Sequence, residues 1–162
     1  MELNGLLSTF PKHIKLFIGV FVIVLSIGYF TGLLFVNQTN SNYPNGIEEN
    51  YIGNENEENA DVMIFKKSKR EMLTIVHTHI LSMSFIFFLL GILVAMTTLS
   101  GKMKTFLMVE PFVSVILTFG GLYLLWSGVS WMKYVVMISG TVMTVVFLIA
   151  AMTVLLQLRK KK

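Results

Sequence analysis

The sequence contains no cysteine, which excludes disulfide bonds, thiolate metal sites and a cysteine nucleophile. Charged residues are also scarce, at 14% of the chain, whereas soluble domains contain roughly 25%. The charge is missing in long blocks, which is typical of membrane-spanning segments. The net charge of +4 comes from residues near the ends of these blocks and not from a basic stripe, so we expect no nucleic-acid partner.

The short motifs that carry soluble-enzyme chemistry are absent as well. The sequence has no phosphate-binding loop, no nucleophile elbow, no zinc-protease motif and no dinucleotide-binding fingerprint. The acidic residues between positions 37 and 71 do not have the spacing of an EF-hand. We therefore predict no catalytic residue.

Four long apolar runs are present, and each is long enough to cross a hydrocarbon core of about 30 Å. The first is longer than the apolar core of a signal peptide, which has about 7–15 residues, and no small-residue cleavage site follows it. We predict an all-α integral membrane protein with four transmembrane helices. The predicted segments are an N-terminal segment (1–15), the first span (16–36), an acidic outer loop (37–71), the second span (72–99), a turn (100–105), the third span (106–126), an outer turn (127–133), the fourth span (134–158) and a basic tail (159–162).

Basic residues predict the orientation, because cytoplasmic segments carry an excess of Lys and Arg. With both termini inside, eight basic residues flank the spans on the inner side and five on the outer side. We predict a multi-pass protein of the cell inner (plasma) membrane, in contact with lipid, with both termini cytoplasmic. The acidic loop is then periplasmic or extracellular and mostly solvated. Its Ile47, Tyr51 and Ile52 allow a small folded cap, and Tyr43–Gly46 predicts a turn.

Two histidines, His77 and His79, lie within the second predicted span, where ionisable side chains are costly and indicate function. Residues two apart on a helix are rotated by about 200°, so the two rings point to nearly opposite faces and cannot hold one metal from one side. Val76-His77-Thr78-His79-Ile80-Leu81 resembles the H-x-H motif of haem-copper oxidases, in which each histidine serves a different haem. The resemblance implies that His77 and His79 are haem ligands.

A second ligand is harder to find, because the third histidine, His13, belongs to the opposite membrane side. A haem b would need a homodimer, a partner subunit or a methionine as its other ligand. Met72 and Met83 share a face with His79, and thioether and imidazole together suit Cu(I), the less favoured metal. The remaining alternative is that the histidines only hydrogen-bond to neighbouring helices, for example to Thr118 or Ser139.

Glu110 is the second ionisable candidate, and it directly precedes Pro111. The interpretation that we favour is a carboxylate at the N-terminus of a helix that begins at Pro111, where the helix dipole stabilises negative charge. The alternative is a proton-relay carboxylate inside the membrane. In the first span, Gly28 and Gly32 form a small-xxx-small pattern, which predicts close helix packing within the chain or, less favoured, in a dimer.

Several motifs together resemble a group of uncharacterised bacterial inner-membrane proteins with four helices and an H-x-H in the second. They span most of residues 28–125 and are Pro44-Asn45-Gly46-Ile47 with Tyr51 and Gly53, Lys66-Lys67-Ser68 before Glu71-Met72-Leu73, His77-Thr78-His79, and Glu110-Pro111-Phe112. The resemblance implies this architecture and supplies no activity.

Three functions remain open from the sequence. The first is a small redox or haem-binding membrane protein that uses His77 and His79. The second is a non-catalytic subunit of a larger membrane complex, with the acidic loop docking a partner. The third is a small transporter, which would need to oligomerise to enclose a cavity.

Overall fold

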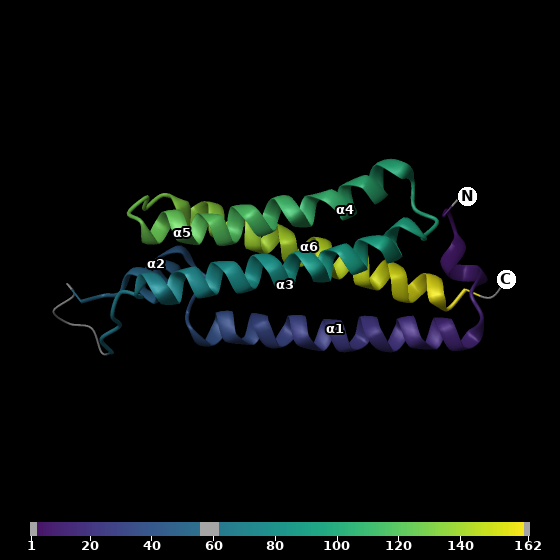
Figure 1. The fold of residues 1–162 in the computed structure, drawn as a ribbon, viewed down its shortest axis with the longest axis horizontal. Coiled ribbons are helices and arrows are strands. Elements are labelled where there is room, and N and C mark those ends of the chain that lie inside the picture. Colours follow the sequence, from purple (N-terminus) through teal and green to yellow (C-terminus); the bar gives the residue numbers. More distant parts are fainter. Residues whose placement is uncertain (1–2, 56–61, 161–162) are drawn as a thin grey trace.

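A computed structural model describes residues 3–55 and 62–160, and these residues are all helical or irregular (Figure 1). Four stretches of the described chain are long and apolar enough to cross a membrane, which confirms the predicted fold class. They are α1 (Lys12–Gln38), α3 (Lys69–Ala95), the continuous stretch Gly101–Trp126, and α6 (Met132–Leu158). The third stretch consists of α4 (Gly101–Val115), a π-helical turn η2 (Ile116–Gly120) and α5 (Gly121–Trp126).

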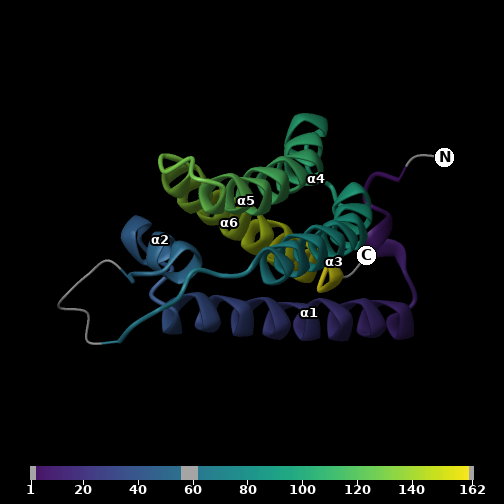
Figure 2. The same cartoon turned by 60° about the vertical axis from the view of Figure 1, so that its left-hand side comes forward.

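The helices α3, α4–α5 and α6 form an antiparallel bundle around one apolar core. Phe147, Leu90, Leu125 and Val154 are almost completely buried in it. Helix α1 lies along one side of this bundle in both views and packs against α6 (Figures 1 and 2). Both described ends of the chain lie at the same end of the bundle, as four spans require (Figure 1).

Helix α1 is much less buried than the other spans. Of its 27 residues only Ile18 and Val22 are buried; Ile14, Phe21 and Leu25 are half-buried against the core, and most of the other apolar side chains are exposed. Tyr29 is also half-buried, and its ring stacks on Phe147 of α6 with centroids 4.0 Å apart. Apolar side chains on an outer helix face are what lipid contact demands.

A small cap covers the end of the bundle opposite the chain termini (Figure 1), and its main element is α2 (Pro44–Ile52). The predicted turn at Tyr43–Gly46 is wrong in detail, because Pro44 is the first helical residue and Gly46 lies in the first turn of α2. Proline fits the first helical position because a backbone N–H there would have no acceptor within the helix, so its absence costs nothing. A Cβ at Gly46 would lie 1.8 Å from the Asn40 carbonyl oxygen, so only glycine fits. Ile47 is buried beneath the cap.

The cap is tied to the spans at two points. Glu48 of α2 forms an ion pair with Lys133 at the start of α6. The indole N–H of Trp126 donates to the carbonyl of Lys67, at 2.7 Å. Helix α3 then begins with a capping box, in which Ser68 and Glu71 bond each other's backbone N–H groups. These contacts set where α3 enters the membrane.

The opposite end of the bundle is closed by the N-terminal segment. A 3₁₀ turn, η1 (Leu6–Thr9), places Leu7 in the core, and the N–H of Leu7 bonds the carbonyl of Met96. Gln157 of α6 is buried at this end of the bundle. Its side-chain oxygen accepts a hydrogen bond from the backbone N–H of Thr98 at 2.8 Å.

Candidate functional site

Glu110 lies well inside the third membrane-crossing stretch. Helix α4 begins at Gly101, so nine residues precede Glu110, which corresponds to about 14 Å of helix. The expectation that the helix starts at Pro111 is therefore wrong, because Pro111 lies inside the helix and is buried. Proline cannot donate the backbone hydrogen bond of a helix interior, so α4 lacks one such bond at this position. Glu110 is therefore not at the N-terminus of a helix, so the interpretation that depended on that position no longer applies.

The carboxyl group of Glu110 is satisfied on one side only. Ser114, one turn further along α4, donates its hydroxyl to Oε1. The other oxygen, Oε2, is buried and has no hydrogen-bond partner among the described residues. Most buried polar atoms in proteins have a partner, so an orphaned oxygen calls for an explanation.

Further hydroxyl groups continue from Ser114 towards the capped end of the bundle. Thr118 lies in the π-turn η2, and its hydroxyl donates to Ser139 of α6 at 2.8 Å, since Ser139 itself donates to the carbonyl of Val135. Ser114, Thr118 and Ser139 are all buried. Helical π-turns are frequent at functional sites, and this one points a hydroxyl into the bundle.

A second pair of hydroxyls lies near the depth of Glu110. Thr118 and Ser139 lie opposite each other on two antiparallel helices. In the same register Glu110, eight residues before Thr118, lies opposite Phe147, eight residues after Ser139. Tyr29 stacks on Phe147 and bonds Thr144 at 3.1 Å. Three helices thus bring polar groups to one apolar level of the bundle.

His79 is exposed on α3 and held in one orientation. Its Nδ1 donates to the carbonyl of Ile75 at 2.7 Å, and its ring stacks on Phe119 with centroids 4.7 Å apart. In a neutral ring with this tautomer, the lone pair lies on Nε2. The hydrogen bond stays within α3, and Thr118 and Ser139 bond each other instead of the histidines.

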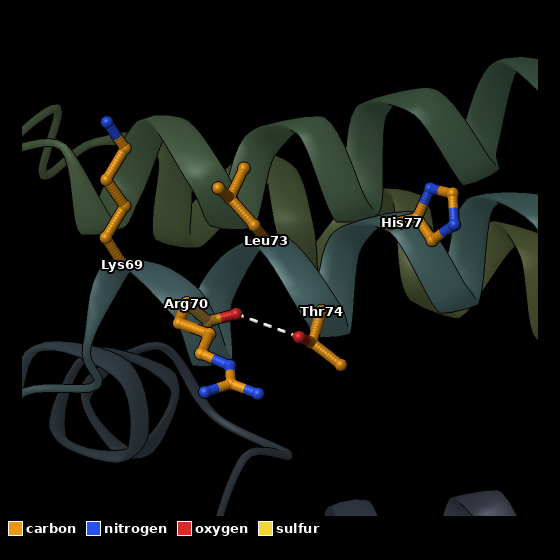
Figure 3. Close-up of a pocket in the computed structure, with 5 residues that line it drawn as sticks. All are labelled: Lys69, Arg70, Leu73, Thr74 and His77. Atoms are coloured by element: carbon orange, nitrogen blue, oxygen red, sulfur yellow. Dashed lines mark hydrogen bonds between the residues drawn. The ribbon is translucent and has the colours of Figure 1, made fainter.

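His77 occupies a different surface of α3, as the 200° rotation predicts. It lines an open, shallow depression together with Lys69, Arg70, Leu73 and Thr74 (Figure 3). The structure therefore separates the two histidines and brings neither to Glu110.

The two methionines that were predicted as possible ligands, Met72 and Met83, differ in how deeply they are buried. Met72 is completely buried in the core, whereas His79 is exposed. Met83, one turn beyond His79, is half-buried against the core. Within residues 3–55 and 62–160, no three His, Asp or Glu side chains gather as a metal site would require.

A comparison with protein families identifies the architecture. A family model described as a transmembrane helical domain, Aq_1264_TM, matches residues 41–162. The chain belongs to the Aq_1264_TM family. No curated protein and no solved structure matched it.

The Aq_1264_TM match covers α2 to α6, including Glu110 and both histidines, and leaves out α1. The unmatched helix is also the least buried span. A Cβ at Gly28 or Gly32 would have no neighbour within 4 Å. A packing role for these glycines stays a prediction, and it would need a neighbour from outside the chain.

Sequence reasoning missed the line of hydroxyls in this Aq_1264_TM chain. Glu110, Ser114 and Thr118 recur every fourth residue, which places them on one side of a helix. That spacing is visible in the sequence and points to one polar stripe. Its burial against Ser139 depends on how α4 and α6 pack.

Proposed function

We propose that this Aq_1264_TM protein binds and releases a proton at Glu110 inside the membrane. The observation that supports the proposal is the buried Oε2 atom without a hydrogen-bond partner. An ionised carboxylate at this depth is costly, and ionisable groups that persist there are usually proton or ion carriers. A proton on Oε2 removes the charge, and the same oxygen can release it when the environment changes.

The buried hydroxyls give the proposed proton a direction of travel. Ser114 contacts the carboxyl group, and Thr118 and Ser139 lie further towards the outer end. His79 stacks on Phe119, the residue after Thr118, so it lies at a depth close to that of Thr118, although its hydrogen bond goes to Ile75. We propose Glu110 and His79 as two stations of one path that serves transport or signalling.

Labelling with dicyclohexylcarbodiimide tests the proton on Glu110. This apolar reagent takes the proton of a neutral carboxyl group, the carboxylate adds to its central carbon, and the adduct rearranges to a stable N-acylurea without a leaving group. We expect folded protein to carry the adduct at Glu110, found by peptide mass spectrometry.

Two variants provide the controls. Glu110→Gln should abolish the label, and Glu71→Gln, which changes an exposed carboxyl at the start of α3, should leave it unchanged. Folded protein that shows no label on Glu110, while SDS-unfolded protein at the same pH is labelled there, would overturn the proposal.

Haem binding at His79 is a second candidate. The bond from Nδ1 to the Ile75 carbonyl supports it, because histidine ligands commonly anchor one ring nitrogen and coordinate with the other. Met83 cannot supply the opposite axial ligand, since a haem plane between residues one turn apart would intersect α3. The second ligand would come from another copy or a partner. A reduced-minus-oxidised spectrum with a haem signal, lost in His79→Ala, is the expected result, and colourless native-membrane protein refutes it.

For the cellular setting we propose a bacterial inner membrane with both termini cytoplasmic, supported by the basic-residue count. The exposed α1, which lies outside the family match, favours a neighbouring protein or a second copy on that side. Cross-linking from a cysteine at Gly32 tests this, because a dimer would give a disulfide-linked product of twice the chain mass. Product formed only with a different protein would favour the accessory-subunit function.

A further inference from the structure

The depression at the outer end of α3 is lined by basic residues at the start of the helix and by less polar residues further along it. Lys69 and Arg70 lie at the first turn of the helix, and His77 lies two turns deeper, about 12 Å along the axis (Figure 3). Leu73 and Thr74 line the surface between them. The lining thus passes from cationic to weakly polar along the direction in which α3 enters the membrane.

The two cations at the mouth form no ion pair with a carboxylate of the described residues. In the described part of the chain, the single ion pair joins Lys133 and Glu48, and no carboxylate there pairs with Lys69 or Arg70. The neighbouring ammonium groups add to the positive potential but face aromatic rings. Lys66 lies 5.1 Å from the ring centroid of Trp126.

Below the depression the surface of α3 becomes apolar. Leu81, Phe85 and Phe88 follow at helical spacing and are 59%, 66% and 55% exposed. No described helix covers them. A ligand that fits both parts must have an anionic head and a long apolar tail.

We propose that this surface of α3 binds one anionic phospholipid. The side chains of Lys69 and Arg70 point to opposite sides of the depression (Figure 3), and the phosphate lies between them, with His77 beside the glycerol level and an acyl chain along Leu81 and Phe85. Charge complementarity commits the site to a phosphodiester headgroup, because basic side chains next to a span attract anionic lipids by about 1 kcal/mol each. The bound lipid would fix the position of α3, which carries both histidines.

Native mass spectrometry of the full chain in detergent tests the proposal. Phosphatidylglycerol and phosphatidylcholine are titrated separately, and bound lipids are counted. We expect one phosphatidylglycerol to bind with clear preference over phosphatidylcholine. The double variant Lys69→Gln/Arg70→Gln should weaken phosphatidylglycerol about thirty-fold, which corresponds to about 1 kcal/mol for each charge.

Three comparisons make the result decisive. The charge-matched variant Lys12→Gln/Lys102→Gln, at the opposite membrane end, should bind as the original chain does, and equal weakening in both double variants would reduce the site to general surface charge. Inorganic phosphate at the same concentration should not bind, and comparable binding would overturn the lipid assignment.

The third comparison addresses the acidic loop of the chain itself. Neutralising Glu57, Glu58 and Asp61, which lie outside the described residues, should leave the affinity for phosphatidylglycerol unchanged. An affinity that appears only after this neutralisation would mean that the loop occupies the depression, and the proposal would be wrong. The double variant at Lys69 and Arg70 should keep its unfolding midpoint, because both side chains are exposed.

Discussion

Replacing Glu110 with leucine should stabilise the protein, although leucine removes a hydrogen bond. The orphaned Oε2 costs about 1–3 kcal/mol of desolvation, because a buried acceptor without a partner loses its water and gains nothing. The bond from Ser114 to Oε1 contributes about 1 kcal/mol and is lost. Ser114 can then donate to the backbone carbonyl of residue 110, as serines in helices often do. The expected net change is a gain of about 1 kcal/mol.

Reversible unfolding in mixed micelles, titrated with SDS and followed by far-ultraviolet circular dichroism, measures this change. Val113→Leu is the matched control, since Val113 is on the same helix and exposed, and it should change the free energy of unfolding by less than about 0.5 kcal/mol. A stabilised Glu110→Leu protein that also loses its proton-binding site would show that function is retained at a cost in stability.

The opposite result would refute the reasoning. If Glu110→Leu lowers the free energy of unfolding by more than about 1 kcal/mol, the carboxyl group has a partner that holds the helices together. Oε2 would then be satisfied in the membrane, and the main support for a proton site at Glu110 would disappear.

Three other predictions test the ends of the bundle. Gln157→Leu should destabilise the protein by about 2–3 kcal/mol, because it removes two bonds to Thr98 and leaves a backbone N–H unpaired; an unchanged SDS midpoint would contradict this. Burial raises the pKa of the Tyr51 hydroxyl above its ordinary 10.0, so its contribution to stability is complete below that pH and is lost as the pH rises through the raised pKa. Above about pH 10 the free energy of unfolding of Tyr51→Phe should therefore fall less than that of the original chain. If the two free energies change with pH in parallel, the burial effect is refuted. Single cysteines at Asn54 and Lys160 should label with an impermeant maleimide from opposite sides of the membrane, and labelling from one side would overturn the orientation.

The local features of this chain follow from its sequence. Hydropathy acts over about twenty consecutive residues, so four spans could be predicted without knowing what each one contacts. The rotation between His77 and His79 also follows from helix geometry alone. The capping box of Ser68 and Glu71 was visible as a Ser-x-x-Glu spacing, although it was not used to place the start of α3.

The candidate site depended on tertiary structure. Pro111 predicted a helix start, whereas in the tertiary structure it is buried inside α4, which places Glu110 nine residues into that helix. Whether Thr118 meets Ser139 or a histidine depends on the register between two helices, which no short-range pattern encodes. Sequence thus determined which segments leave water, because that choice depends on each segment's own apolar surface. Tertiary structure decided which polar groups find partners, because a hydrogen bond needs atoms from different helices within about 3 Å of each other.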